Sequence, residues 1–110
     1  MTSFQDRERA FEAKYAHDEE FRFLVTARRD KLFAHEAANL LGLSEAEAEG
    51  LTTAVLGLRD GPDHDSLLIR YAADVFAAHR RSDAADGLSA SLHACETKAR
   101  QQLLAMHDPD

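Results

Sequence analysis

Residues 21–47 read FRFLVTARRDKLFAHEAANLLGLSEAE, and this segment is the strongest indication of a helical fold. Neither glycine nor proline interrupts it before Gly42, which suits the position just after a helix because glycine readily adopts a positive φ. Its bulky apolar side chains recur at spacings that place them on one broad face of a helix: Phe21, Leu24, Val25, Leu32, Phe33, Leu40 and Leu41. The stretch therefore predicts a core-facing helix that ends at Leu41.

A second helix is predicted to begin immediately afterwards. Ser44, followed three residues later by Glu47, has the pattern of a capping box, in which each residue satisfies a free backbone N–H of the other. The helix is expected to end at residues 60–62, Asp-Gly-Pro, because glycine and proline break helices. Its apolar face is formed by Leu51, Val55 and Leu58.

Two more helices follow, and a frayed tail is expected at residues 108–110. Asp63 is the predicted cap of a third helix, whose buried face consists of Leu67, Leu68, Tyr71, Ala72, Val75 and Phe76. After a predicted loop at residues 82–87, Ser89 is expected to cap a fourth helix, whose apolar face consists of Leu92, Cys95, Ala99, Leu103 and Met106. Four helices with short connections predict an all-α fold, a four-helix bundle.

The chain carries a net charge of −7, and the charge is unevenly distributed. Residues 1–34 contain seven basic and seven acidic side chains, so the remaining residues carry the whole excess. An acidic surface repels phosphate backbones and anionic lipid, which argues against nucleic acid as a partner. The single cysteine, Cys95, cannot form an internal disulfide, and no apolar run is long enough to span a membrane. We therefore expect a cytoplasmic protein that does not insert into the membrane.

Residues 1–20 differ in character from the predicted bundle at residues 21–107. Their bulky apolar residues are only Phe4, Phe11 and Tyr15, which on a helix form a stripe too narrow to be part of a core. Charged side chains surround this stripe. A helix that binds in a partner's groove presents aromatic anchors interleaved with charges, so this segment is predicted to be a long N-terminal helix that binds a partner. A solvated helix face is the alternative.

Motifs for catalysis are absent from the sequence, so the chain is not expected to be an enzyme. Residues 35–39, His-Glu-Ala-Ala-Asn, lack the second histidine that a zinc-binding helix needs, and the acidic residues between 60 and 65 lack the spacing of a calcium loop. Surface and capping roles are expected for both. His79, His93 and Cys95 could approach one another as a metal site, although nothing in their spacing requires it.

Several stretches resemble a known family. Residues 6–20 read DRERAFEAKYAHDEE, with Phe4 before them and Phe23 after them, and ARRDKL and AANLLG follow at residues 27–32 and 37–42. This pattern is similar to the zeta subunit of the F-type ATP synthase of alphaproteobacteria. The similarity is dense in the N-terminal third of the chain, and beyond it only the pattern of helices is shared.

The resemblance implies an inhibitor of ATP hydrolysis that is peripheral to the inner membrane through the ATP synthase and needs no cofactor. Zeta subunits are four-helix bundles whose N-terminal segment, mobile in the free protein, inserts between a catalytic β subunit and its α neighbour, near the γ stalk. They block rotation in the direction of hydrolysis more than in that of synthesis. Carried over to this chain, the implied partner-binding residues are Phe4, Asp6, Arg7, Glu8, Arg9, Phe11, Glu12, Lys14, Tyr15, His17, Asp18, Glu19 and Glu20.

Two alternatives stay open. A nucleotide-binding regulatory module would hold ATP or ADP weakly beside Arg28, Arg29 and Lys31, although no phosphate-binding loop accompanies these residues. The other alternative is a generic helical adaptor, or a small metalloprotein whose metal is held by His79, His93 and Cys95.

Overall fold

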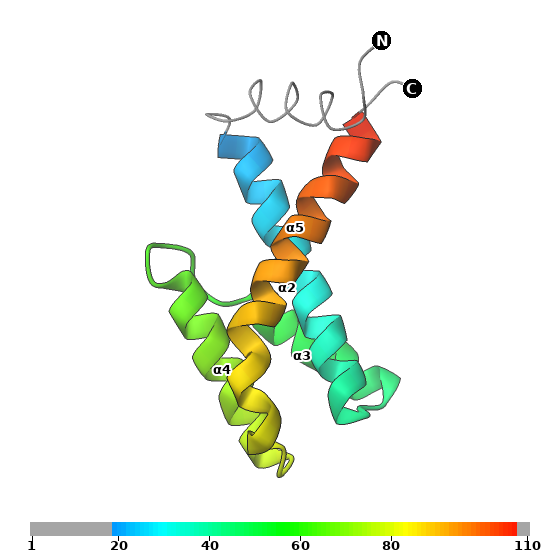
Figure 1. Ribbon diagram of the computed structural model, residues 1–110, viewed down its shortest axis with the longest axis vertical. Coiled ribbons are helices and arrows are strands. Elements are labelled where there is room, and N and C mark those ends of the chain that lie inside the picture. Colours follow the sequence, from blue (N-terminus) through cyan, green and yellow to red (C-terminus); the bar gives the residue numbers. More distant parts are fainter. Residues whose placement is uncertain (1–18, 108–110) are drawn as a thin grey trace.

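The computed structural model describes residues 19–107, and this part of the chain is helical (Figure 1). Its elements are α2 (Glu19–Leu41), α3 (Glu45–Leu56), α4 (His64–Ala78), the short 3-10 helix η1 (Ser82–Gly87) and α5 (Leu88–His107). The predicted all-α fold with four helices is confirmed for these residues. The predicted arm up to residue 18 and the predicted tail at residues 108–110 lie outside the described residues.

Helices α2 and α5 form the central pair of the fold. They run antiparallel and cross near their middles, so that α2 begins and α5 finishes at the same end of the molecule (Figure 1). Helices α3 and α4 lie beside the opposite half of this pair. Within the part of the chain that the structure describes, α2 and α5 therefore project together beyond the other two helices.

Two apolar clusters follow from this arrangement. The larger one joins all four helices and consists of Phe33, Ala34, Ala37, Ala38, Leu51, Val55, Leu68, Ala72, Phe76, Leu88, Leu92 and Cys95. The smaller one, in the projecting part, joins the start of α2 to the end of α5 and consists of Phe21, Val25, Ala99, Leu103 and Leu104. Burying a side chain such as Phe21 or Val25 stabilises a fold by roughly 1.5–3 kcal/mol. The smaller cluster therefore fixes the first turns of α2.

Local sequence signals set the boundary between α2 and α3 as predicted. Gly42 has a φ of +65°, and its N–H donates to Asn39 O at 3.2 Å, while the N–H of Leu43 donates to Ala38 O at 3.0 Å. These bonds satisfy carbonyls that the end of α2 leaves free. Ser44 Oγ accepts from Glu47 N at 3.2 Å, and Glu47 Oε1 accepts from Ser44 N at 2.9 Å, so the capping box is confirmed. The hydrogen bond from Ser44 lowers the pKa of the Glu47 carboxyl.

Substitution of Ser44 by alanine is expected to lower the free energy of unfolding by about 1 kcal/mol, because an N–H at the start of α3 loses its acceptor. Urea unfolding followed by circular dichroism measures this loss. Ser89→Ala is the matched control, because Ser89 lies one residue inside α5 rather than at its cap. An equal loss in the two variants would contradict the role of the capping box.

The predicted start of α4 is correct in position, whereas the predicted start of α5 is wrong. Asp63 stands at the N-cap of α4, but its side chain makes no capping hydrogen bond and instead accepts from Arg59 Nη2 at 2.6 Å. The loop expected at residues 82–87 is the 3-10 helix η1, which leads directly into α5. Ser89 is therefore not a cap, because α5 begins before it, at Leu88.

The predicted apolar faces are correct in part. Leu40 and Met106 were expected to face the core, but they are 51% and 66% exposed. Leu104, which the predicted face omitted, is buried instead of Met106, and Ala34, Ala37 and Ala38 fill the core side of α2. The alanines allow the neighbouring helices to approach α2 closely, so large side chains are not needed there.

Candidate functional site

The predicted partner-binding residues from Phe4 to Asp18 lie outside the described residues. Of the predicted set, the structure describes Glu19 and Glu20, which form the exposed first turn of α2. Two acidic side chains at this position interact favourably with the positive end of the helix dipole. The described part of the site is therefore the base from which the predicted arm extends.

A surface groove of about 650 Å³ lies next to this base. Its walls include Glu19 and Phe23 of α2 and Asp60 of the connection between α3 and α4, and His64 lines it as well. Phe23 is 61% exposed, so its ring gives the groove an apolar wall. The lining of the groove therefore includes acidic side chains, the basic side chain of Arg22 and the aromatic ring of Phe23.

The three residues considered for nucleotide binding do not lie together. Arg28 and Lys31 line a small surface hollow of about 160 Å³ with Leu32 and His35, and Arg28 Nε donates to Gln102 Oε1 of α5 at 2.6 Å. Arg29 is buried, and its guanidinium is occupied by carboxylates. Arg29 therefore does not share a surface with Arg28 and Lys31.

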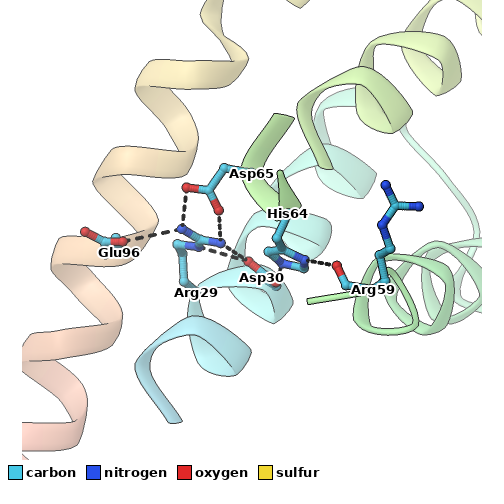
Figure 2. Close-up of polar contacts among 6 residues, drawn as sticks. All are labelled: Arg29, Asp30, Arg59, His64, Asp65 and Glu96. Atoms are coloured by element: carbon cyan, nitrogen blue, oxygen red, sulfur yellow. Dashed lines mark hydrogen bonds and ion pairs between the residues drawn. The ribbon is translucent and has the colours of Figure 1, made fainter. Parts of the chain in front are cut away.

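Arg29, itself buried, is the centre of an ionic cluster that joins three helices (Figure 2). Its Nη2 lies 2.8 Å from Asp65 Oδ1 of α4 and 2.9 Å from Oδ1 of its neighbour Asp30. Its Nη1 lies 3.4 Å from Glu96 Oε1 of α5. Burial alone would lower the pKa of Arg29, but the hydrogen bond to Asp65 and the charge of Asp30 raise the pKa above its ordinary value. Arg29 therefore remains a cation inside the fold.

His64 extends the ionic cluster on the other side of Asp30 (Figure 2). Its Nε2 lies 2.7 Å from Asp30 Oδ2, and its Nδ1 lies 2.9 Å from the carbonyl oxygen of Arg59. Both His64 and Asp30 are buried. Asp30 thus uses one carboxylate oxygen for Arg29 and the other for His64. The ionic cluster, defined as Arg29, Asp30, His64, Asp65 and Glu96, ties the start of α4 to α2 and α5.

The sequence contains a signal for this ionic cluster, because two of its members are in register with buried apolar stripes. Arg29 lies four residues after Val25 and four before Phe33, so it continues the buried stripe of α2. His64 stands in the same way four residues before Leu68 on the buried face of α4. A charged residue in register with a buried stripe indicates a buried ion pair, and Arg29 and His64 both meet this condition.

A second groove, of about 590 Å³, lies between α4 and α5. Arg29, Asp65 and Glu96 of the ionic cluster line it, together with Arg70 and His93. Its cations are matched by carboxylates in the same wall, so the groove presents no concentrated charge of one sign. It provides no specific chemistry for an anion or a cation.

The metal site considered for His79, His93 and Cys95 does not form among residues 19–107, where no three histidine, cysteine or acidic side chains are placed to hold a metal ion. His79 is exposed, and its Nδ1 donates to the carbonyl of Val75 at 2.9 Å. Cys95 is buried, and its thiol donates to Glu36 Oε2 at 3.4 Å. Burial and the Glu36 carboxylate raise the pKa of the Cys95 thiol to about 11, so the thiol is not a reactive nucleophile near neutral pH.

Comparisons with known proteins give one match. The family model described as ATPase inhibitor subunit zeta matches residues 1–102, which include both the predicted arm and nearly all of the described helices. No curated protein and no solved structure matches the chain. A search for membrane-spanning helices among residues 19–107 finds none of sufficient length and apolarity.

Proposed function

Because the chain belongs to the ATPase inhibitor subunit zeta family, we propose that it binds the catalytic head of an F-type ATP synthase and blocks ATP hydrolysis. The match over residues 1–102 carries this proposal, since it covers the arm and the bundle as one unit. The family description names an inhibitor subunit, which suggests a protein without catalytic activity of its own. The protein would reach the inner membrane only through the ATP synthase.

In the proposed mechanism, the arm at residues 4–20 inserts between a catalytic β subunit and its α neighbour, near the γ stalk. The composition of the arm supports this role. Phe4, Phe11 and Tyr15 offer aromatic surface to bury at an interface, and the surrounding charges can pair with side chains of either sign. Ordering a segment on binding costs free energy, so a few such anchors are expected to carry most of the affinity.

The structure supports a second part of the mechanism, the anchoring of the arm. The inserted arm can resist rotation of the γ stalk only if the start of α2, from which it extends, is held rigidly. Helix α2, as described from Glu19, includes the last two residues of the arm, and its first turns are fixed to α5 through Phe21 and Val25. The ionic cluster holds the middle of α2 to α4 and α5. A force on the arm is thereby passed to the whole bundle.

Two measurements test the proposal. The full chain, added to purified catalytic head, is expected to lower the rate of ATP hydrolysis. Added to the intact enzyme, it is expected to lower the rate of ATP synthesis to a smaller extent. Used as bait on solubilised membranes, it is expected to retain the α and β subunits. Leu40→Ala is a suitable control, because Leu40 is an exposed side chain at the far end of α2 and its removal should leave both results unchanged. Unchanged hydrolysis at saturating amounts of the full chain would refute the proposal.

A further inference from the structure

The imidazole of His64 lies between two hydrogen-bond acceptors. Nδ1 faces the carbonyl oxygen of Arg59 at 2.9 Å, and a backbone carbonyl can only accept. Nε2 faces Asp30 Oδ2 at 2.7 Å, while the other oxygen of this carboxylate accepts from Arg29. A neutral imidazole has one N–H, so either tautomer would turn a lone pair toward one of these acceptors. Only the doubly protonated imidazolium satisfies both contacts.

The charges around His64 agree with this protonation state. On the side of α2, His64 faces Asp30, which in turn contacts Arg29. Glu19 and Arg22, also of α2, line the adjacent groove. From the connection between α3 and α4 come Asp60, Arg59 and Asp63, the last two of which pair with each other. Asp65 of α4 and Glu96 of α5 bind Arg29. Within the ionic cluster three carboxylates oppose one guanidinium, so a protonated His64 reduces the net negative charge.

We propose that His64 is a proton-operated latch. In its protonated form it fixes two segments to α2, the connection at residues 57–63 and the start of α4. When His64 loses its proton, both segments are released. The latch spans two segments that are otherwise distant in sequence, since its two acceptors belong to Asp30 and Arg59. It also forms part of the groove beside the base of the arm. This inference concerns the bundle and does not depend on the proposed function.

The direction of the pH dependence follows from the contacts. Burial lowers the pKa of His64, but the hydrogen bond to the Arg59 carbonyl and the hydrogen bond and charge of Asp30 outweigh burial and the nearby Arg29, and they raise the pKa above the ordinary 6.5. A group with a raised pKa in the folded state stabilises the fold fully below its unfolded pKa. The contribution of His64 is therefore complete below about pH 6.5 and is lost as the pH rises through the raised value.

The other shifted groups of the described part act outside this pH range. The pKa values of Glu47 and Asp63 are lowered from 4.5 and 3.8, so these carboxyls affect stability under acidic conditions. The pKa of Cys95 is raised from 9.0 to about 11, so its thiol affects stability only at alkaline pH. Among the described groups, loss of stability as the pH rises above 6.5, below the alkaline range of Cys95, is thus the signature of His64.

Nuclear magnetic resonance on the full wild-type chain tests the latch directly. The ring protons of His64 are expected to titrate with a midpoint above 6.5. The amides of His64 and Leu67, which donate to Gly61 O and Asp63 O, should lose protection against hydrogen exchange as the pH passes this midpoint. Protection is compared after correction for the intrinsic pH dependence of exchange. The amide of Ala48, bonded to Ser44 O at the start of α3, should keep its protection.

A pair of variants tests the same latch by a second route. Between pH 6.5 and pH 8.5 the urea midpoint is expected to fall in the wild type and in His79→Gln, which removes an exposed histidine, and to stay nearly constant in His64→Gln. A His64 midpoint at or below 6.5, or protection that does not follow it, overturns the proposal. So does an equal fall in all three proteins. If His64→Gln does not fold, the titration and exchange on the wild type decide alone.

Discussion

Removal of residues 1–18 is expected to abolish inhibition of ATP hydrolysis and to leave the helical bundle folded. The reason is a separation of roles within the chain. Among the described residues, both apolar clusters are formed by side chains between Phe21 and Leu104, all of which the truncated protein keeps. The aromatic anchors Phe4, Phe11 and Tyr15 are lost completely. An ATPase assay with the truncated protein measures the first effect, and circular dichroism with thermal unfolding measures the second.

The opposite end of the chain offers a matched control for this deletion. Removal of residues 108–110, the predicted tail, shortens the chain without touching the arm or either apolar cluster, and inhibition is expected to remain complete. Inhibition that survives loss of residues 1–18 would show that the bundle itself blocks the enzyme. Unfolding of the truncated protein would instead show that residues 1–18 contribute to the fold.

The parts of the fold that were predicted correctly depend on short-range signals. Gly42 after the last apolar turn, and Ser44 with Glu47 three residues later, each act within one turn of a helix, so the sequence alone contains the whole interaction. The prediction failed where position depends on distant segments. Met106 was expected in the core, but within the described structure α3 and α4 do not extend to that end of α5, and the side chain is exposed.

The ionic cluster shows the same limit more strongly. Its members come from α2, from the start of α4 and from the middle of α5, and Arg29 is separated from Asp65 by 36 residues and from Glu96 by 67. Register with the buried stripes marks Arg29 and His64 as buried, but it does not identify their partners. Only the packing of the helices brings the opposite charges together. The acidic segment at residues 60–65, expected to serve surface and capping roles, is therefore partly structural, because Asp65 pairs with Arg29.

Substitution of Arg29 by methionine is expected to lower the free energy of unfolding by about 3–5 kcal/mol, which is the usual cost of removing one partner from a buried ion pair. Methionine keeps a long apolar side chain, so the loss of packing is small. The main cost arises because Asp30, which is 3% exposed, loses its guanidinium partner inside the fold. The side chains of Asp65 and Glu96 are 64% and 35% exposed, so hydrogen bonds to water can replace much of the interaction with Arg29 that these carboxylates lose.

Urea unfolding at pH 6, where His64 is expected to be protonated, measures this effect. Arg28→Met is the matched control, because its side chain is half-buried and its hydrogen bond within the described residues is to a neutral partner, Gln102, so a loss of about 1 kcal/mol or less is expected. If the cost comes from the stranded carboxylate, Asp30→Asn should recover part of the stability in the Arg29→Met background, since asparagine can still accept from His64 without a charge. Equal losses for the two arginine variants, or no recovery in the double variant, would show that the ionic cluster does not hold α2 in place.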